Sequence, residues 1–127
     1  MQASQADAGK GMAYLVLENQ FNSLISNEKM RRIIIWVLVD KMPALNELDL
    51  KRDNMGDQLL SAVADPHFEK SEINFRAMDA ILMGRVYYLT LHAKMKENPF
   101  CGIDLQESVR QEQIKKALKD LIDLIHA

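Results

Sequence analysis

The sequence has few of the residues that cross-link, bend or interrupt a polypeptide chain. Its one cysteine, Cys101, excludes an internal disulfide framework and suits a reducing compartment. Only five glycines and three prolines occur, so helices have few interruptions. The longest apolar run, residues 33–39, is too short to cross a bilayer, and residues 1–10 do not have the pattern of a secretory signal. We therefore expect a cytoplasmic protein that does not contact a membrane.

Neither positive nor negative charge is in clear excess. The 16 Lys and Arg residues are nearly balanced by 18 Asp and Glu, and the formal net charge is −2. This balance argues against nucleic-acid binding through bulk electrostatics. A hydrophobic share of 48% in 127 residues is enough for one globular core. We expect a flexible N-terminal arm at residues 1–10 and a single helical domain at residues 11–127.

Apolar residues recur at helical spacing along most of the chain, which predicts an all-α fold: a compact bundle of about five helices. Residues 65–68, with a proline, are interpreted as a turn. We predict a first helix from Gly11 to Ile25, a second helix from Glu28, and a short third helix capped by Asp53 or Asn54. A long central helix follows from Glu72 to Glu97. The last predicted helix is a long C-terminal one, and Asp104 with Glu107 has the spacing of a capping box at its start.

The second helix is ambiguous, because the β-branched run at residues 33–39 is also compatible with a buried strand. A helix is favoured, since the sequence offers no partner strand and the periodic neighbourhood is about 14 residues long. On a helix, the apolar residues cover nearly the whole circumference, which predicts a central, buried helix. Pro43 either ends this helix or starts the next turn.

The long helix carries apolar residues on two separate faces, and a narrow polar strip lies between them. One stripe consists of Ile73, Ala77, Ile81, Gly84, Tyr88, Leu91 and Met95. The second consists of Phe75, Leu82, Val86, Leu89 and Ala93, with Met78 at its edge. The predicted solvated face includes Asp79 and Thr90.

Two apolar stripes require two bodies to cover the helix, either two helices of this chain or one helix of this chain and a second protein. Gly84 costs helix stability, so it suggests that another helix approaches closely. If the second body is a partner, most simply a second copy in a homodimer, the predicted interface consists of Met78, Leu82, Gly84, Arg85, Val86, Leu89, His92 and Lys96.

Catalytic and metal-binding motifs are lacking. None of the three histidines has neighbours at the spacing of a zinc motif, and Cys101 has no evident base beside it. We expect no catalytic residues, no metal and no cofactor. Arg85, His92 and Lys96 share the polar strip and suggest either an anion or acidic-peptide site, or long side chains that snorkel to water.

The leading functional hypothesis is therefore a non-enzymatic helical interaction module, an adaptor or regulator. It would self-associate or dock a partner helix through an apolar groove. The alternative is a DNA-binding transcriptional regulator that uses basic helix faces. These faces hold Lys29, Arg31 and Arg32 on the second helix, and Lys115, Lys116 and Lys119 on the last.

Overall fold

The structure is a computed structural model that describes residues 7–39 and 43–127. Within these ranges the chain forms helices and no strand, so the predicted all-α fold is confirmed. The helices are α2 (Lys10–Ser26), α3 (Glu28–Val39), α4 (Pro43–Val63), α5 (Asp65–Phe68), α6 (Phe75–Lys96) and α7 (Ser108–His126).

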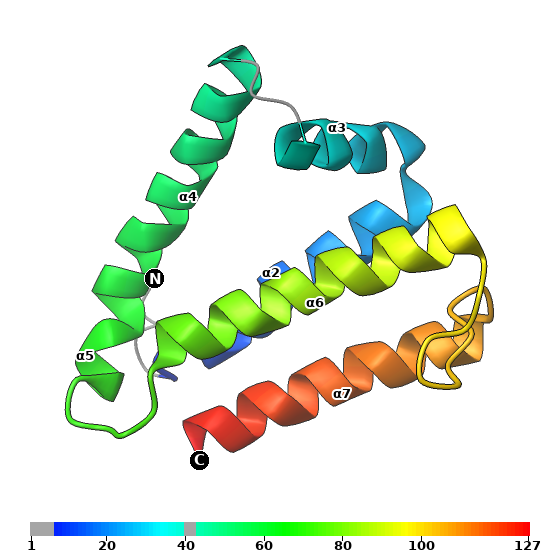
Figure 1. Ribbon diagram of the computed structural model, residues 1–127. Helices are drawn as coiled ribbons and strands as arrows, with labels where there is room; N and C mark the ends of the chain where they lie inside the picture. Colours follow the sequence, from blue (N-terminus) through cyan, green and yellow to red (C-terminus); the bar gives the residue numbers. More distant parts are fainter. Residues whose placement is uncertain (1–6, 40–42) are drawn as a thin grey trace.

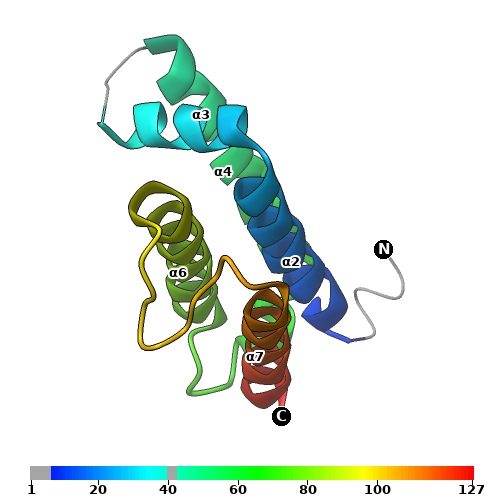
Figure 2. The same ribbon diagram turned by 90° about the vertical axis from the view of Figure 1, so that its right-hand side faces the viewer.

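Helices α2, α6 and α7 lie side by side as a three-helix bundle, whereas α3 and α4 extend away from it (Figures 1 and 2). The bundle encloses the main hydrophobic core, to which each of the three helices contributes. The buried members are Leu17, Phe21, Leu82, Val86, Ala93, Leu105, Leu118 and Ile122.

The start of α2 is fixed by a local carboxylate cap. Asp7 accepts hydrogen bonds from the backbone N–H groups of Gly9 and Gly11, each at 3.1 Å. Gly9 has φ 79°, which favours glycine, and an added Cβ would lie 3.0 Å from Val63 of α4. Of the predicted N-terminal arm, residues 1–6 lie outside the described residues, while Ala8 and Gly9 are buried and Lys10 begins α2.

The segment that was ambiguous between helix and strand is a helix, α3. Asn27 separates it from α2 with an extended backbone, and its side chain accepts a hydrogen bond from Met30 N at 3.1 Å. The prediction of a central, buried helix is wrong. Only Ile34 is buried, and Trp36 is 55% exposed, because the break at Asn27 directs α3 away from the bundle (Figure 1).

Helix α4 is much longer than the predicted third helix. It begins at Pro43 rather than at Asp53 or Asn54, and proline suits a first helical turn because its missing N–H has no partner there. Its described side chains are exposed along most of its length, and burial begins only near Val63. We refer to α3 and α4 together as the α3–α4 arm.

A second, smaller aromatic cluster fixes the base of this arm to the bundle. The predicted turn at residues 65–68 forms a single helical turn, α5. Phe68 stacks on Phe75 with ring centroids 5.0 Å apart, and His126 of α7 meets both rings edge-on at 5.2 Å. The base of the arm therefore packs against the beginning of α6 and the end of α7.

The ends of α6 and α7 differ from the predicted caps. Asn74 caps α6 by accepting a hydrogen bond from Ala77 N at 3.1 Å, so the helix begins at Phe75 rather than at Glu72. Asp104 accepts a hydrogen bond from Gln106 N within the preceding loop, so the predicted capping box with Glu107 is wrong and α7 begins at Ser108.

Adjacent residues of α6 give a direct test of its two faces. Leu82→Asp should unfold the protein, because Leu82 is 8% exposed and an unpaired carboxylate would enter the core. Leu82→Ala should cost about 2–5 kcal/mol. Ile81→Asp should leave the fold intact, since Ile81 is 62% exposed. Circular dichroism with urea titration measures the helical content and the free energy of unfolding of each variant. An Ile81→Asp variant that unfolds beside a Leu82→Asp variant that stays folded would contradict this arrangement.

Candidate partner-binding surface

The second apolar stripe of α6 faces the core of this chain. Phe75 is 3% exposed and Val86 is 0% exposed. Leu82 and Val86 share one cluster with side chains of α2 and α7, and Leu89 packs against that cluster. Because the chain itself covers them, the placement of Leu82 and Val86 in a partner interface is wrong.

The core face of α6 also includes positions predicted to be solvated. Thr90 is 0% exposed, and its hydroxyl donates to the carbonyl oxygen of Val86 at 2.7 Å. This bond to the preceding turn lets a hydroxyl lie in the core without an unsatisfied donor. Burial raises the pKa of the Asp79 carboxyl, which lies on the same side. The buried face of α6 is therefore wider than its apolar residues indicate.

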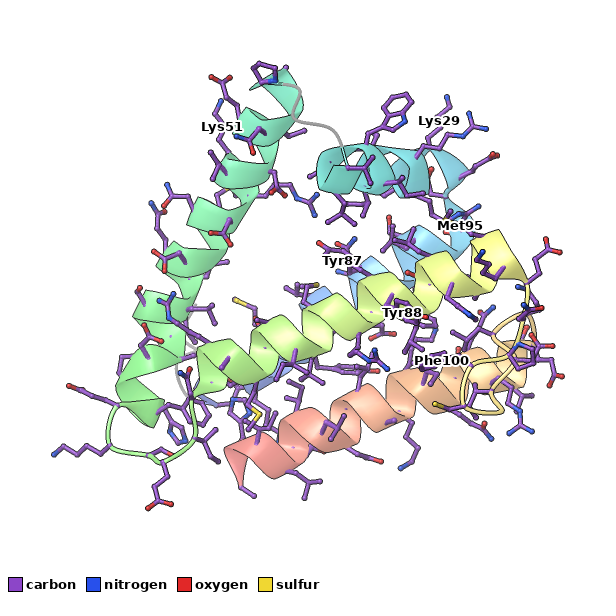
Figure 3. All side chains as sticks on the ribbon, viewed as in Figure 1. Lys29, Lys51, Tyr87, Tyr88, Met95 and Phe100 are labelled. Atoms are coloured by element: carbon purple, nitrogen blue, oxygen red, sulfur yellow. The ribbon has the colours of Figure 1, made fainter. Side chains whose placement is uncertain are left out.

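The first apolar stripe is the exposed one. We call Ala77, Ile81, Gly84, Tyr88 and Met95 the exposed stripe of α6. Its larger members are 45–62% exposed, and Tyr88 and Met95 are labelled in Figure 3. A Cβ added to Gly84 would meet no atom within 4 Å, so no helix of the described ranges makes the close approach predicted there.

An aromatic cluster follows one edge of the exposed stripe. The guanidinium carbon of Arg85 lies 5.4 Å from the ring centroid of Tyr88 and 5.3 Å from that of Phe100. His92 stacks on Tyr88 with centroids 5.6 Å apart. Arg85 is therefore held on two rings by cation–π contacts while its charge stays exposed. Phe100, from the loop before α7, was missed because it lies outside any periodic segment (Figure 3).

The α3–α4 arm exposes apolar residues as well. On α4, Leu48, Met55 and Leu59 share one face at helical spacing and are 51%, 66% and 40% exposed. We call these three the apolar stripe of α4. On α3, Leu38 is 65% exposed and Val39 is 75% exposed. The arm and α6 thus present large side chains that no described part of this chain covers.

Arg76 ties the C-terminal end of α4 to the N-terminal end of α6. Its guanidinium donates to both carboxylate oxygens of Asp65, at 2.8–3.1 Å, to Ser61 Oγ at 2.9 Å, and to Asp57. These hydrogen bonds hold the pKa of Asp65 below its usual value. The network fixes where the arm leaves the bundle.

Four of the six basic residues of the DNA-binding alternative contact other groups of the same chain. Arg31 donates to the carbonyl oxygens of Leu24 and Ile25 and so caps α2. Paired side chains account for others, namely Arg32 with Glu28, Lys115 with Glu112 and Asn22, and Lys116 with Asp120. These pairs offset part of the positive charge that phosphate would require.

The described ranges contain no group of three His, Cys, Asp or Glu side chains placed to hold a metal ion. Among the same residues, no helix has the length and apolar character needed to span a membrane. Comparisons with protein-family models, with curated proteins and with solved structures found no match.

Gly84 is a site where a small change should stabilise the isolated chain. Gly84→Ala should raise the free energy of unfolding by about 1 kcal/mol, because alanine is the better helix former and its Cβ meets open space. Chemical denaturation at a concentration where the protein is monomeric measures this. A loss of stability in the monomer would show that Gly84 is packed within its own chain.

The Arg76 network predicts a pH-dependent contribution to the position of α4. Arg76→Gln should increase hydrogen exchange in the last turns of α4 at pH 7, because the hydrogen bonds to Asp65 and Asp57 are weakened. The pKa of Asp65 is lowered, so this stabilisation is present above its ordinary pKa and is lost as pH falls through the lowered one. The difference between variant and wild type should therefore shrink in acid; equal exchange at pH 7 contradicts the prediction.

Proposed function

We propose that this protein is a non-enzymatic interaction module of the cytoplasm, an adaptor or regulator. It binds a helix, from a second copy or from another protein, on its exposed apolar faces. The observation that carries the proposal is the exposed stripe of α6 together with the apolar stripe of α4. Both lie on long, regular helices, and neither is covered by any described part of this chain.

The total surface of the molecule supports a partner of considerable size. The accessible surface is 8571 Å² for a chain of 14.5 kDa. A folded monomer of this mass has about 6,900 Å², so the excess is roughly 1,700 Å². Permanent complexes bury about 1,000–2,500 Å² on each partner. The excess accompanies an arm that projects from the bundle, and this arm and α6 both carry exposed apolar side chains that a partner can cover.

The chemistry of the exposed faces suits a helical partner. Apolar side chains one and two turns apart on α6 and α4 have the spacing that binds the apolar face of an amphipathic helix. Met55, Met78 and Met95 are all exposed, at 40–66%, and methionine adapts its shape to a partner surface. An apolar surface that serves no partner would instead favour aggregation.

A paired substitution on the exposed stripe tests the proposal. Ile81→Asp with Met95→Asp should preserve the helical circular dichroism spectrum, since both side chains are more than 60% exposed, and should abolish association. Light scattering over a range of concentrations detects self-association, and affinity capture of the tagged protein detects another partner.

Leu124→Asp, on an equally exposed leucine of α7, is the matched control and should leave association unchanged. A wild-type chain that stays monomeric at every concentration, and that captures no protein in a manner sensitive to the paired substitution, would rule the proposal out.

A further inference from the structure

We infer that the helix bound on the exposed stripe of α6 carries carboxylates along one edge of its apolar face. These carboxylates meet Arg85 and Lys96, which lie beside the stripe with His92 between them. We call these three residues the basic edge of α6. The inference rests on the proposed function and names the chemistry of the partner. Three observations on the described residues carry it: the position of the two cations, the lack of free carboxylates around them, and the contacts that hold Arg85.

The basic edge runs parallel to the exposed stripe. At about 100° per residue, its three members fall within about 40° of one another, on the side of the stripe next to Ile81 and Tyr88. Arg85 and Lys96 are three helical turns apart, about 16 Å along the axis, and both are exposed. A helix that packs along the stripe therefore passes beside both cations.

Within α6, no carboxylate lies on the exposed side of the helix. Asp79 is the one acidic residue between Phe75 and Lys96, and it lies on the opposite, core-facing side. Glu97 follows as the C-cap with a left-handed backbone, φ 58°, so it does not continue the helical spacing of the basic edge. On this side of α6, the carboxylates of a partner therefore meet cations and no like charge.

The carboxylates of the loop before α7, and of α7 itself, already have contacts within the chain. Asp104 accepts a hydrogen bond from Gln106 N at 3.0 Å. The ion pairs of the other acidic residues are Glu107 with Arg110, Glu112 with Lys115, Asp120 with Lys116, and Asp123 with Lys10. None of the ion pairs formed within residues 7–39 and 43–127 includes Arg85 or Lys96. The two cations are therefore open to a carboxylate from outside the chain.

Two aromatic rings hold Arg85 in position for a carboxylate. Its guanidinium carbon lies 5.4 Å from the ring centroid of Tyr88 and 5.3 Å from that of Phe100. Because these cation–π contacts restrain the side chain, it loses less conformational freedom when it binds a partner. The planar fork of N–H donors matches the two oxygens of a carboxylate, whereas Lys96 acts as a point charge. Arg85 is therefore the stronger of the two anchors.

An amphipathic helix fits this surface better than a nucleic acid does. The stripe beside the basic edge is apolar, with Ile81 62% and Met95 61% exposed, and the apolar face of a helix can cover it. A nucleic acid carries a phosphate charge on every nucleotide, whereas the two cations lie about 16 Å apart. The net charge of −2 also repels a polyanion. A partner helix needs only one carboxylate near each cation.

Three synthetic peptides test the inference. Each has the length of α6, 22 residues, with leucine at helical spacing along one face. Along one edge of that face, the first peptide has glutamate, the second glutamine and the third lysine. Fluorescence anisotropy with the full chain, at concentrations where light scattering shows a monomer, measures the dissociation constants. The glutamate peptide should bind at least about tenfold more tightly than the lysine peptide, and high salt should reduce this difference.

Substitution of the two cations shows whether the basic edge causes this preference. Arg85→Gln with Lys96→Gln should remove the preference for glutamate and leave the affinity for the glutamine peptide nearly unchanged. Arg85→Glu with Lys96→Glu should reverse the preference, so that the lysine peptide binds most tightly. Circular dichroism should show both variants folded, since the two side chains are exposed. Lys29→Gln with Lys119→Gln is the matched control: it changes the net charge equally at exposed lysines of α3 and α7 and should preserve the preference for glutamate.

Equal affinity for the three peptides overturns the inference, but the proposed function stands if Ile81→Asp with Met95→Asp abolishes that binding. A preference for glutamate that persists in Arg85→Gln with Lys96→Gln also overturns it. So does the absence of any peptide binding, and the light-scattering and capture experiments then decide the proposed function. A single-stranded oligonucleotide of mixed sequence is the fourth probe. If it binds more tightly than the glutamate peptide, and the glutamine variant abolishes that binding, the ligand is a phosphate chain and the inference is wrong.

Discussion

The rest of the structure depends on one side of α6 being packed in the core between α2 and α7. Leu82, Val86 and Ala93 are buried there together with Phe21 of α2 and Ile122 of α7. Because this side of α6 is buried against α2 and α7, the exposed stripe on the other side of the helix faces away from the bundle. The break at Asn27 and the network of Arg76 then direct the α3–α4 arm outward, so the stripe of α4 is left uncovered as well.

Much of the fold could be predicted because helical spacing is a local signal. The α-helical character, α2, α7 and most of α6 follow from the positions of apolar residues and from few breakers. The first half of α4 was missed, since Asp53 and Asn54 resemble a cap and few apolar residues precede them at core spacing. Asp104 resembles a cap for the same reason, but its carboxylate orders the loop around Gln106 instead.

The candidate site could be predicted only in part. The sequence shows that α6 has two apolar stripes, but both have leucine, isoleucine or methionine at the same spacing, so it cannot tell which one faces α2 and α7. That choice depends on tertiary packing, which also buried Thr90 and left Gly84 open. The cation–π contacts of Arg85 depend on Phe100, whose position is set by a loop rather than by a periodic helix.

The central claim is that α4 is covered by association and not by its own chain. Hydrogen exchange of α4 amides, measured by mass spectrometry at low and high protein concentration, tests this most directly. Self-association predicts that protection over residues 43–58 and around Gly84 rises together as concentration increases, while the core around Phe21 and Ile122 stays equally protected throughout. Protection of α4 that is the same at every concentration, in the absence of other proteins, would contradict self-association through this helix.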